Sequence, residues 1–126
     1  MIPPHKLIGL PYRLGADPLL HHAADCLSVS RAVLLWCGID SPAPQRNWYR
    51  RLRQKDYAIF EEELASWGKL TNEARLGVIG LVRNPDDTCG LAAFYEDGWL
   101  HCNHSQAVTW TPPTLLMPAA LYCHQK

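Results

Sequence analysis

The sequence predicts an α+β domain in which helices come first along the chain and strands follow. Apolar residues recur at helical spacing in the first half of the chain, most clearly between Cys26 and Trp67. From Leu76 onward the pattern changes to short apolar runs separated by glycine and by turn-forming residues, which is typical of an antiparallel sheet. Helices followed by strands indicate the α+β class. The length of 126 residues suits one domain with its own core, so residues 1–126 are treated as a single domain.

Three helices are predicted in the first half. Asp25 is the expected N-cap of a helix from Cys26 to Cys37, and Gly38 is its expected stop. Prolines in the segment 40–44 form a loop, after which residues 47–52 suit a short helix. A further helix is expected to begin with Asp56 as N-cap and to end with Gly68 as C-cap. Its inner stripe comprises Tyr57, Phe60, Leu64 and Trp67.

Five strands are predicted in the second half. They cover residues 77–83, 89–95, 99–102, 107–110 and 120–123. Glu96-Asp-Gly98 is the expected hairpin turn, with the glycine supplying a positive φ. The apolar, proline-rich segment from Trp110 to Tyr122 has two interpretations, a final strand after a loop or an exposed docking patch, and the strand is the prediction.

Charge and composition narrow the classes of function. The 12 basic and 12 acidic residues balance, so the chain lacks the excess of positive charge that would indicate a nucleic-acid partner. The basic group Arg50, Arg51, Arg53 and Lys55 is expected to be a solvated surface, with contact to an anionic partner as the alternative. No apolar stretch has the length of a signal peptide or a membrane helix, so synthesis in a cytoplasm without membrane insertion is expected. The five cysteines are widely spaced without a C-x-x-C pair, which favours reduced thiols.

Cys26 is the candidate nucleophile. It follows Asp25 at the expected start of a helix, where unpaired backbone amides and the positive end of the helix dipole favour a thiolate. The alternative is a buried structural cysteine on an amphipathic helix. Two neighbouring segments accompany it, Gly9-Leu-Pro-Tyr-Arg-Leu-Gly-Ala16 and His22-Ala-Ala-Asp-Cys-Leu-Ser28.

These two segments resemble the nucleophile region of the NlpC/P60 cysteine peptidases. The resemblance implies a papain-like fold in which the helix that starts at Cys26 packs against an antiparallel sheet carrying the other catalytic groups. It also implies that the Cys26 thiolate attacks cell-wall peptides. Tyr12 corresponds to the aromatic residue beside the nucleophile, where its hydroxyl contacts the thiol or a substrate carbonyl, or the ring simply packs under the turn.

The second half of the resemblance lies in Cys89-Gly-Leu-Ala-Ala-Phe-Tyr-Glu-Asp-Gly-Trp-Leu-His-Cys102, which is similar to the phage tail members of the family. His101 matches the polar residue that orients the catalytic imidazole. The imidazole itself is missing, because its place falls on Cys89 or Gly90. A cysteine peptidase needs a base to share the thiol proton and an acid to protonate the leaving amine.

Three arrangements would compensate for the missing histidine. His101 itself could act as the base, or another histidine could approach the thiol, namely His104, His21 or His22. The third arrangement is a zinc site formed by Cys89, His101, Cys102 and His104, although side chains 101 and 102 point to opposite faces of a strand. The catalytic candidates are therefore Cys26, His101 and Tyr12, and no cofactor or metal is expected.

The expected function is that of a phage tail-associated protein with impaired chemistry and a mainly structural role in tail assembly. Its expected location is the virion tail, and its expected partners are other tail proteins, with peptidoglycan peptides as a further partner. One alternative is an active cysteine endopeptidase that cleaves peptidoglycan stem peptides during phage entry, with Cys26 attacking and backbone amides holding the oxyanion. Another is a thiol amidase or acyltransferase on the same fold, which would need a lipid-sized apolar cleft.

Overall fold

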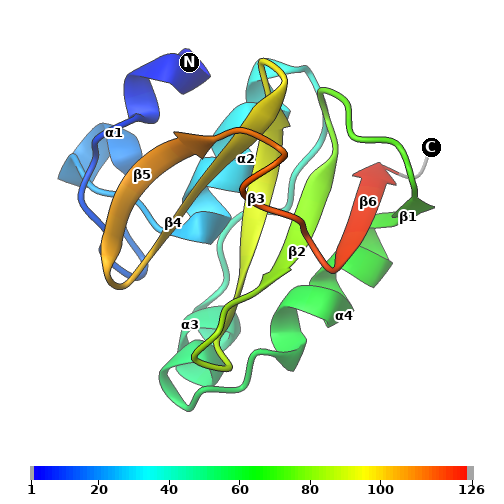
Figure 1. Cartoon of the computed structure of the whole chain (residues 1–126). Coiled ribbons are helices and arrows are strands. Elements are labelled where there is room, and N and C mark those ends of the chain that lie inside the picture. Colours follow the sequence, from blue (N-terminus) through cyan, green and yellow to red (C-terminus); the bar gives the residue numbers. More distant parts are fainter. Residues whose placement is uncertain (1, 125–126) are drawn as a thin grey trace.

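A computed structural model describes residues 2–124 of the chain, and it confirms the α+β class (Figure 1). In this part of the chain, four α-helices precede or lie against a six-stranded antiparallel sheet with the strand order β1-β6-β2-β3-β4-β5. The helices are α1 (Pro18–His21), α2 (Cys26–Trp36), α3 (Arg46–Arg53) and α4 (Ala58–Trp67), preceded by the 3₁₀ turn η1 (Pro4–Leu7). The strands are β1 (Gly68–Thr71), β2 (Ile79–Arg83), β3 (Cys89–Tyr95), β4 (Gly98–Asn103), β5 (Gln106–Thr111) and β6 (Ala120–His124).

Helix α2 forms as predicted. It begins at Cys26 with Asp25 as N-cap, and the chain turns away at Gly38, whose φ of 74° is in the left-handed region. The N-cap prediction for α4 is wrong. Its N-cap is Tyr57, and the Asp56 carboxylate instead accepts a hydrogen bond of 2.7 Å from Arg51 Nε. An arginine within reach competes for a carboxylate more strongly than a backbone amide does.

Gly68 does not end α4 in a left-handed conformation, as the sequence predicted. Its backbone is extended and it begins β1, a strand that the sequence analysis missed. Gly68 pairs with His124 of β6, and a Cβ at this position would collide with the Cys123 carbonyl. Close approach of two backbones, not a positive φ, is therefore the reason for glycine here.

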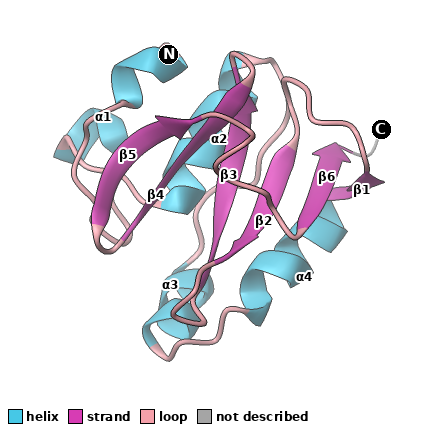
Figure 2. Ribbon diagram, viewed as in Figure 1, coloured by secondary structure: helices cyan, strands magenta, loops and turns pink. Residues whose placement is uncertain are grey.

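The five predicted strands are present, and β3 has the predicted bounds (Figure 2). The turn between β3 and β4 differs in detail from the prediction. Positive φ values occur at Glu96 and Asp97, while Gly98 is the first residue of β4. A Cβ on Gly98 would collide with the indole of Trp110, so this glycine makes room for a ring on the neighbouring strand.

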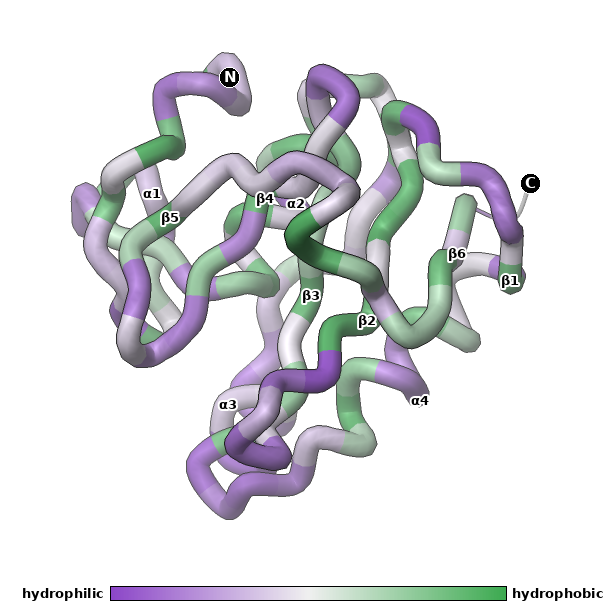
Figure 3. The backbone as a smooth tube through the Cα atoms, viewed as in Figure 1, coloured by the Kyte–Doolittle hydropathy of each residue, from purple (hydrophilic) through white to green (hydrophobic). Residues whose placement is uncertain are grey.

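The main hydrophobic core lies between the sheet and the helices α2, α3 and α4. It includes Val29 and Val33 of α2 and Leu91 and Leu100 of the sheet. The opposite face of the sheet carries a smaller cluster around Phe94 and Trp99, and the loop before β6 packs against it. Figure 3 shows hydrophobic residues concentrated along the central strands, while the β2–β3 hairpin and the turn between α3 and α4 are hydrophilic.

The C-terminal segment forms the predicted strand. Strand β6 lies between β1 and β2, so the chain returns to the sheet after crossing its open face (Figure 1). The loop that leads into it leaves Leu115 and Met117 exposed, at 76% and 85% of their surface. Among the helices of residues 2–124, none combines the length and the apolar character needed to cross a bilayer.

Candidate functional site

The three residues predicted as catalytic all line one cavity of about 690 Å³, here called the thiol cavity. It lies where the start of α2 meets the β2–β3 hairpin and the end of β4. Tyr12 comes from the segment before α1, Cys26 from the first turn of α2, and His101 from β4. Residues far apart in the sequence thus border one cavity, but Cys26 and His101 reach it from opposite faces of the sheet.

The two segments quoted for the resemblance lie side by side. Tyr12 forms an isolated parallel bridge with Ala24. The Arg13 amide donates to the Ala24 carbonyl, and the Ala24 amide donates to the Pro11 carbonyl, both at 3.0 Å. The residues on either side of Tyr12 thus hold the chain in place immediately before Cys26.

Asp25 fastens this arrangement to the helix. Its carboxylate accepts hydrogen bonds from the amides of Ser28 at 2.8 Å and Gly15 at 2.7 Å, while the Ser28 hydroxyl accepts from the Asp25 amide at 2.9 Å. This is a capping box with one additional partner. Burial raises the pKa of Asp25, and the hydrogen bonds from Ser28 and Gly15 oppose the shift. Asp25 is thus committed to holding the backbone.

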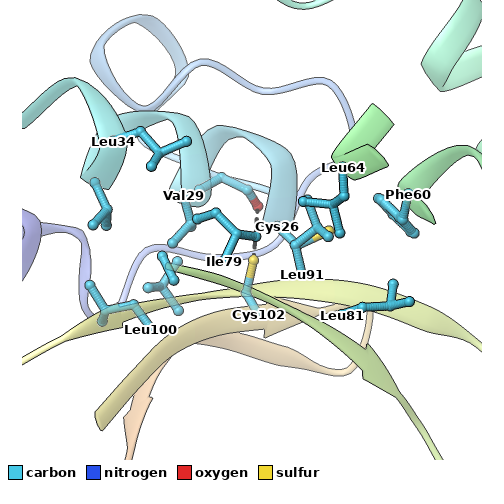
Figure 4. Packing of buried hydrophobic residues seen from close by; sticks show 14 of the residues in the cluster. Cys26, Val29, Leu34, Phe60, Leu64, Ile79, Leu81, Leu91, Leu100 and Cys102 are labelled. Carbon is cyan, nitrogen blue, oxygen red and sulfur yellow. Dashed lines mark hydrogen bonds between the residues drawn. The ribbon is translucent and has the colours of Figure 1, made fainter. Parts of the chain in front are cut away.

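Cys26 occupies the helix start as predicted, but its surroundings do not favour a thiolate. The side chain is buried and belongs to the main core (Figure 4). Burial raises the pKa of the Cys26 thiol well above 9.0, and the nearby Asp25 and Cys102 raise it further. The backbone amides of Leu91 and of Cys26 itself act in the opposite direction without reversing the shift. The direction is opposite to the one that the helix start predicted, because loss of solvation outweighs the backbone hydrogen bonds that favour the thiolate.

Tyr12 is half-buried beside these groups. Burial, followed by the proximity of Cys26 and Asp25, raises the pKa of the Tyr12 phenol to about 12. The hydroxyl therefore keeps its proton at neutral pH and can donate a hydrogen bond into the thiol cavity. It cannot serve as a base under those conditions.

His101 lies at the edge of the thiol cavity, with its ring engaged elsewhere. Its Nε2 is 2.7 Å from the hydroxyl of Thr111 on β5. Alternation along β4 places Trp99 and His101 on one face of the sheet, and Leu100 and Cys102 on the face that packs against the helices. Burial lowers the pKa of His101, which keeps the ring neutral. His101 is thus held as part of the sheet, on the face opposite to α2.

The other histidines also have separate surroundings. His104 Nε2 is 3.9 Å from Asp86 Oδ2 across the mouth of the thiol cavity. His21 Nδ1 accepts from the Asp17 amide, and His22 is exposed in a left-handed conformation. Within residues 2–124, no histidine forms a hydrogen bond with the Cys26 sulfur.

The four donors of the hypothetical zinc site do not come together. Among the residues that the structure describes, no group of three or more His, Cys, Asp or Glu side chains is arranged to hold a metal ion. The reason is the alternation that separates the side chains of His101 and Cys102 across the sheet.

Gly90 is a position that faces the Cys26 thiol. A Cβ built on Gly90 would lie 3.8 Å from Cys26 Sγ, an ordinary contact distance. A side chain at residue 90 would therefore start next to the thiol, at one of the two places where the resemblance locates the missing histidine. In this chain that place holds no side chain.

Cys102 is a residue that the sequence analysis did not place beside the Cys26 thiol. Its sulfur lies toward α2, 3.8 Å from the Ala24 carbonyl (Figure 4). Burial, and next the proximity of Asp25, raises the pKa of Cys102 to about 12. Strand alternation was the available signal, since it places Cys102 with the core residue Leu100. A second thiol that keeps its proton at neutral pH therefore lies near Cys26 in the core.

Neither a scan against protein-family models nor a search of curated proteins finds a match for this chain.

Proposed function

We propose that this chain is an NlpC/P60-like domain without peptidase activity, which serves as a structural component of a phage tail. One observation carries the proposal: the Cys26 thiol is buried beside the carboxylate of Asp25, and the adjacent position 90 is glycine. The resemblance in the segments around Tyr12 and Cys26 supports the family, and the similarity of residues 89–102 to tail-associated members supports the setting.

The chemistry of thiol attack explains why this arrangement favours an inactive domain. Attack on an amide requires a thiolate and then an acid that protonates the leaving amine. Burial and Asp25 both disfavour the thiolate of Cys26. Tyr12 stays protonated, and the His101 ring is held by Thr111. The described residues thus supply a nucleophile without a base.

The same residues suit a structural role. Hydrogen bonds join residues 9–16 to residues 22–28, and we call this contact the clasp. It surrounds the buried Asp25 and attaches the start of α2 to the preceding loop. On the other face of the sheet, the loop before β6 exposes Leu115 and Met117, which supply apolar surface for a neighbouring tail protein. The domain would contribute a fixed shape and this contact surface to the assembly.

The two enzymatic alternatives differ in what supports them. An active endopeptidase is favoured by the volume of the thiol cavity, about 690 Å³, which is in the range of small-ligand sites. An amidase or acyltransferase would need an apolar cleft that reaches the thiol. The molecule has a mainly apolar cavity, but Leu27 lines it and Cys26 does not.

Peptidoglycan hydrolysis tests the proposal directly. The intact chain and a Cys26→Ala variant are incubated with purified peptidoglycan and with short stem peptides from mildly acidic to mildly basic pH. We expect no release of soluble muropeptides by either protein. Release by the intact chain that disappears in the variant would establish a cysteine endopeptidase and overturn the proposal.

The structural half of the proposal has its own test. Mass spectrometry of purified virions from a phage that encodes the chain should detect it as a tail component. A double Leu115→Lys, Met117→Lys variant should fold normally, as judged by thermal melting, and be depleted from tails. Normal incorporation of that variant would remove the loop from the contact surface, and absence of the chain from virions would contradict the structural role.

A further inference from the structure

Helix α3 carries four arginines among its eight residues, and three of them form one exposed line. They are Arg46, Arg50 and Arg53, here called the arginine stripe. Residues three or four positions apart lie on the same face of a helix, so these side chains follow one another along about 10 Å of α3. Trp48 and Leu52 of α3 pack into the core instead. The arginine stripe therefore faces solvent.

The arginine stripe has no acidic partner within the described part of the chain. None of its three guanidinium groups forms an ion pair there. The fourth arginine of α3, Arg51, differs because it binds both Asp56 and Glu62. Arg50 donates to the neutral side chain of Asn47 at 2.8 Å, and this bond leaves its charge uncompensated. The fold thus neutralises one arginine of α3 and leaves three.

The stability of α3 does not account for the arginine stripe. Arg46 is the first residue of the helix, where the positive end of the helix dipole disfavours a cation. The first turn has neither an acidic residue nor a side-chain cap to offset this charge. Arg50 and Arg53 lie in the last turn and suit the dipole there, but Arg46 and Arg50 repel each other at a spacing of four residues. The line of charge as a whole therefore has a different basis.

Two neighbouring elements carry acidic groups next to α3. On α4, Glu62 is held at Arg51. On the β2–β3 hairpin, Asp86 and Asp87 line the thiol cavity together with Arg53. The unpaired positive surface is therefore confined to a narrow line along α3. A DNA duplex or a bilayer would bring its phosphates against these carboxylates, whereas a single polypeptide segment can follow the line and avoid them.

We infer that the arginine stripe is a docking surface for an acidic segment of another protein. A guanidinium group binds a carboxylate through paired N–H donors, and three such groups in line match a partner with several carboxylates in line. Acidic side chains on alternate residues of an extended segment recur about every 7 Å, close to the rise of about 6 Å between Arg46 and Arg50. Charge complementarity of this kind selects the partner and speeds its association.

This surface is separate from the contact surface of the proposed function. The loop before β6 is apolar and packs on the open face of the sheet, whereas α3 packs on the opposite face. The inference does not depend on a setting in a phage tail, because it uses only the charges of α3 and its neighbours. It assigns a protein partner to the basic group for which a solvated surface was the expectation from the sequence.

An octaglutamate peptide is the probe for the test, and octaglutamine is the matched peptide without charge. Both have blocked ends and a fluorescent label, and fluorescence anisotropy follows their binding to the intact chain near neutral pH. We expect octaglutamate to bind saturably at about 20 mM salt, with a dissociation constant of about 1 mM or tighter, and octaglutamine not to bind. Raising the salt to about 0.5 M should weaken octaglutamate binding about tenfold or more, because salt screens exposed charges.

Two triple variants remove the same charge from different places. The stripe variant is Arg46→Gln, Arg50→Gln, Arg53→Gln, and the control variant is Arg13→Gln, Lys69→Gln, Arg75→Gln, all at exposed positions. The stripe variant should weaken octaglutamate binding about tenfold or more, and the control variant should change it by less than about twofold. Thermal melting confirms that both variants are folded. The stripe variant should melt no lower than the intact chain, because the replaced arginines form no ion pair among the described residues.

Three outcomes would overturn the inference. One is the absence of saturable octaglutamate binding at low salt, which would leave the arginine stripe as a solvated surface. Another is an equal loss of affinity in the stripe and control variants, which would mean attraction to net charge alone. The third is tighter binding of a short DNA duplex, or of vesicles that contain phosphatidylglycerol, than of octaglutamate, which would assign the surface to nucleic acid or to a membrane.

Discussion

Two sets of polar groups along helix α2 differ in their hydrogen bonding. At the start of α2, Asp25 and Ser28 hold each other and the backbone in a closed set of hydrogen bonds. One turn further on, Arg31 of α2 and Trp48 of α3 have buried N–H groups without partners among the described residues. The groups that look catalytic in the sequence are therefore already occupied, and groups that belong to no motif are the ones left open.

This difference separates two meanings of a buried polar residue. A buried group with all its partners in the fold contributes to stability and is not available to a ligand. A buried group without partners destabilises the fold until something binds it. Five substitutions, taken from the largest expected effect to the smallest, test this difference and the state of the groups around the thiol cavity.

Asp25→Ala should give the largest loss of stability. It removes the cap of α2 and leaves the amides of Ser28 and Gly15 without a partner, so we expect about 2–4 kcal/mol less free energy of unfolding. Urea denaturation measures the change. Asp17→Ala, which removes the exposed cap of α1, is the control and should cost less than about 1 kcal/mol. Equal losses of unfolding free energy in the two variants would show that the buried hydrogen bonds of Asp25 stabilise the fold no more than an exposed N-cap does.

Gly90→His should raise the reactivity of Cys26. A Cβ at residue 90 fits 3.8 Å from Cys26 Sγ, and a protonated imidazole there would lower the pKa of the thiol. We expect alkylation of Cys26 by iodoacetamide near neutral pH to become about tenfold faster, measured by mass spectrometry of the peptide that contains it. Gly90→Gln controls for the added bulk. Equal rates in the two variants would mean that residue 90 does not reach the thiol.

Ser28→Ala and Ser30→Ala should change stability in opposite directions. Ser28 completes the capping box, so its loss should cost about 1 kcal/mol. The Ser30 hydroxyl is buried without a partner, and alanine favours the helix, so its removal should add about 1 kcal/mol. Both are read from urea denaturation. Destabilisation by Ser30→Ala would indicate that its hydroxyl is satisfied in solution.

His101→Gln should have the smallest effect, visible only as a change in pH dependence. Burial lowers the pKa of His101 below 6.5, so the stability linked to its neutral ring is present above 6.5 and is lost as the pH falls through the folded value. The variant should therefore lose less stability than the intact chain between about pH 7.5 and pH 5. His22→Gln, at an exposed position, should leave the profile unchanged. An unchanged profile in His101→Gln would show that its ring is not desolvated.

Local patterns predicted most of the secondary structure. Periodicity and the cap at Asp25 located α2, and the alternation in residues 89–95 located β3 with its correct bounds. The predictions failed at Asp56, whose carboxylate binds Arg51 of the preceding helix, and at Gly68, where pairing with β6 brings two backbones close together. Strand β1 was missed because its four residues carry no strong alternation and are held by pairing with β6.

For the candidate site, the sequence by itself determined which residues are present: a cysteine at a helix start after an aspartate, a tyrosine before it, and no histidine between residues 22 and 101. Only the tertiary structure decided their states. It buried Cys26 against Asp25 and Cys102, and it turned His101 to the opposite face of the sheet. It also buried N–H groups of Trp48 and Arg31 without partners among the described residues. The order of residues along the chain determines which side chains are present. Their solvation and hydrogen-bond partners depend on contacts between segments far apart in the chain.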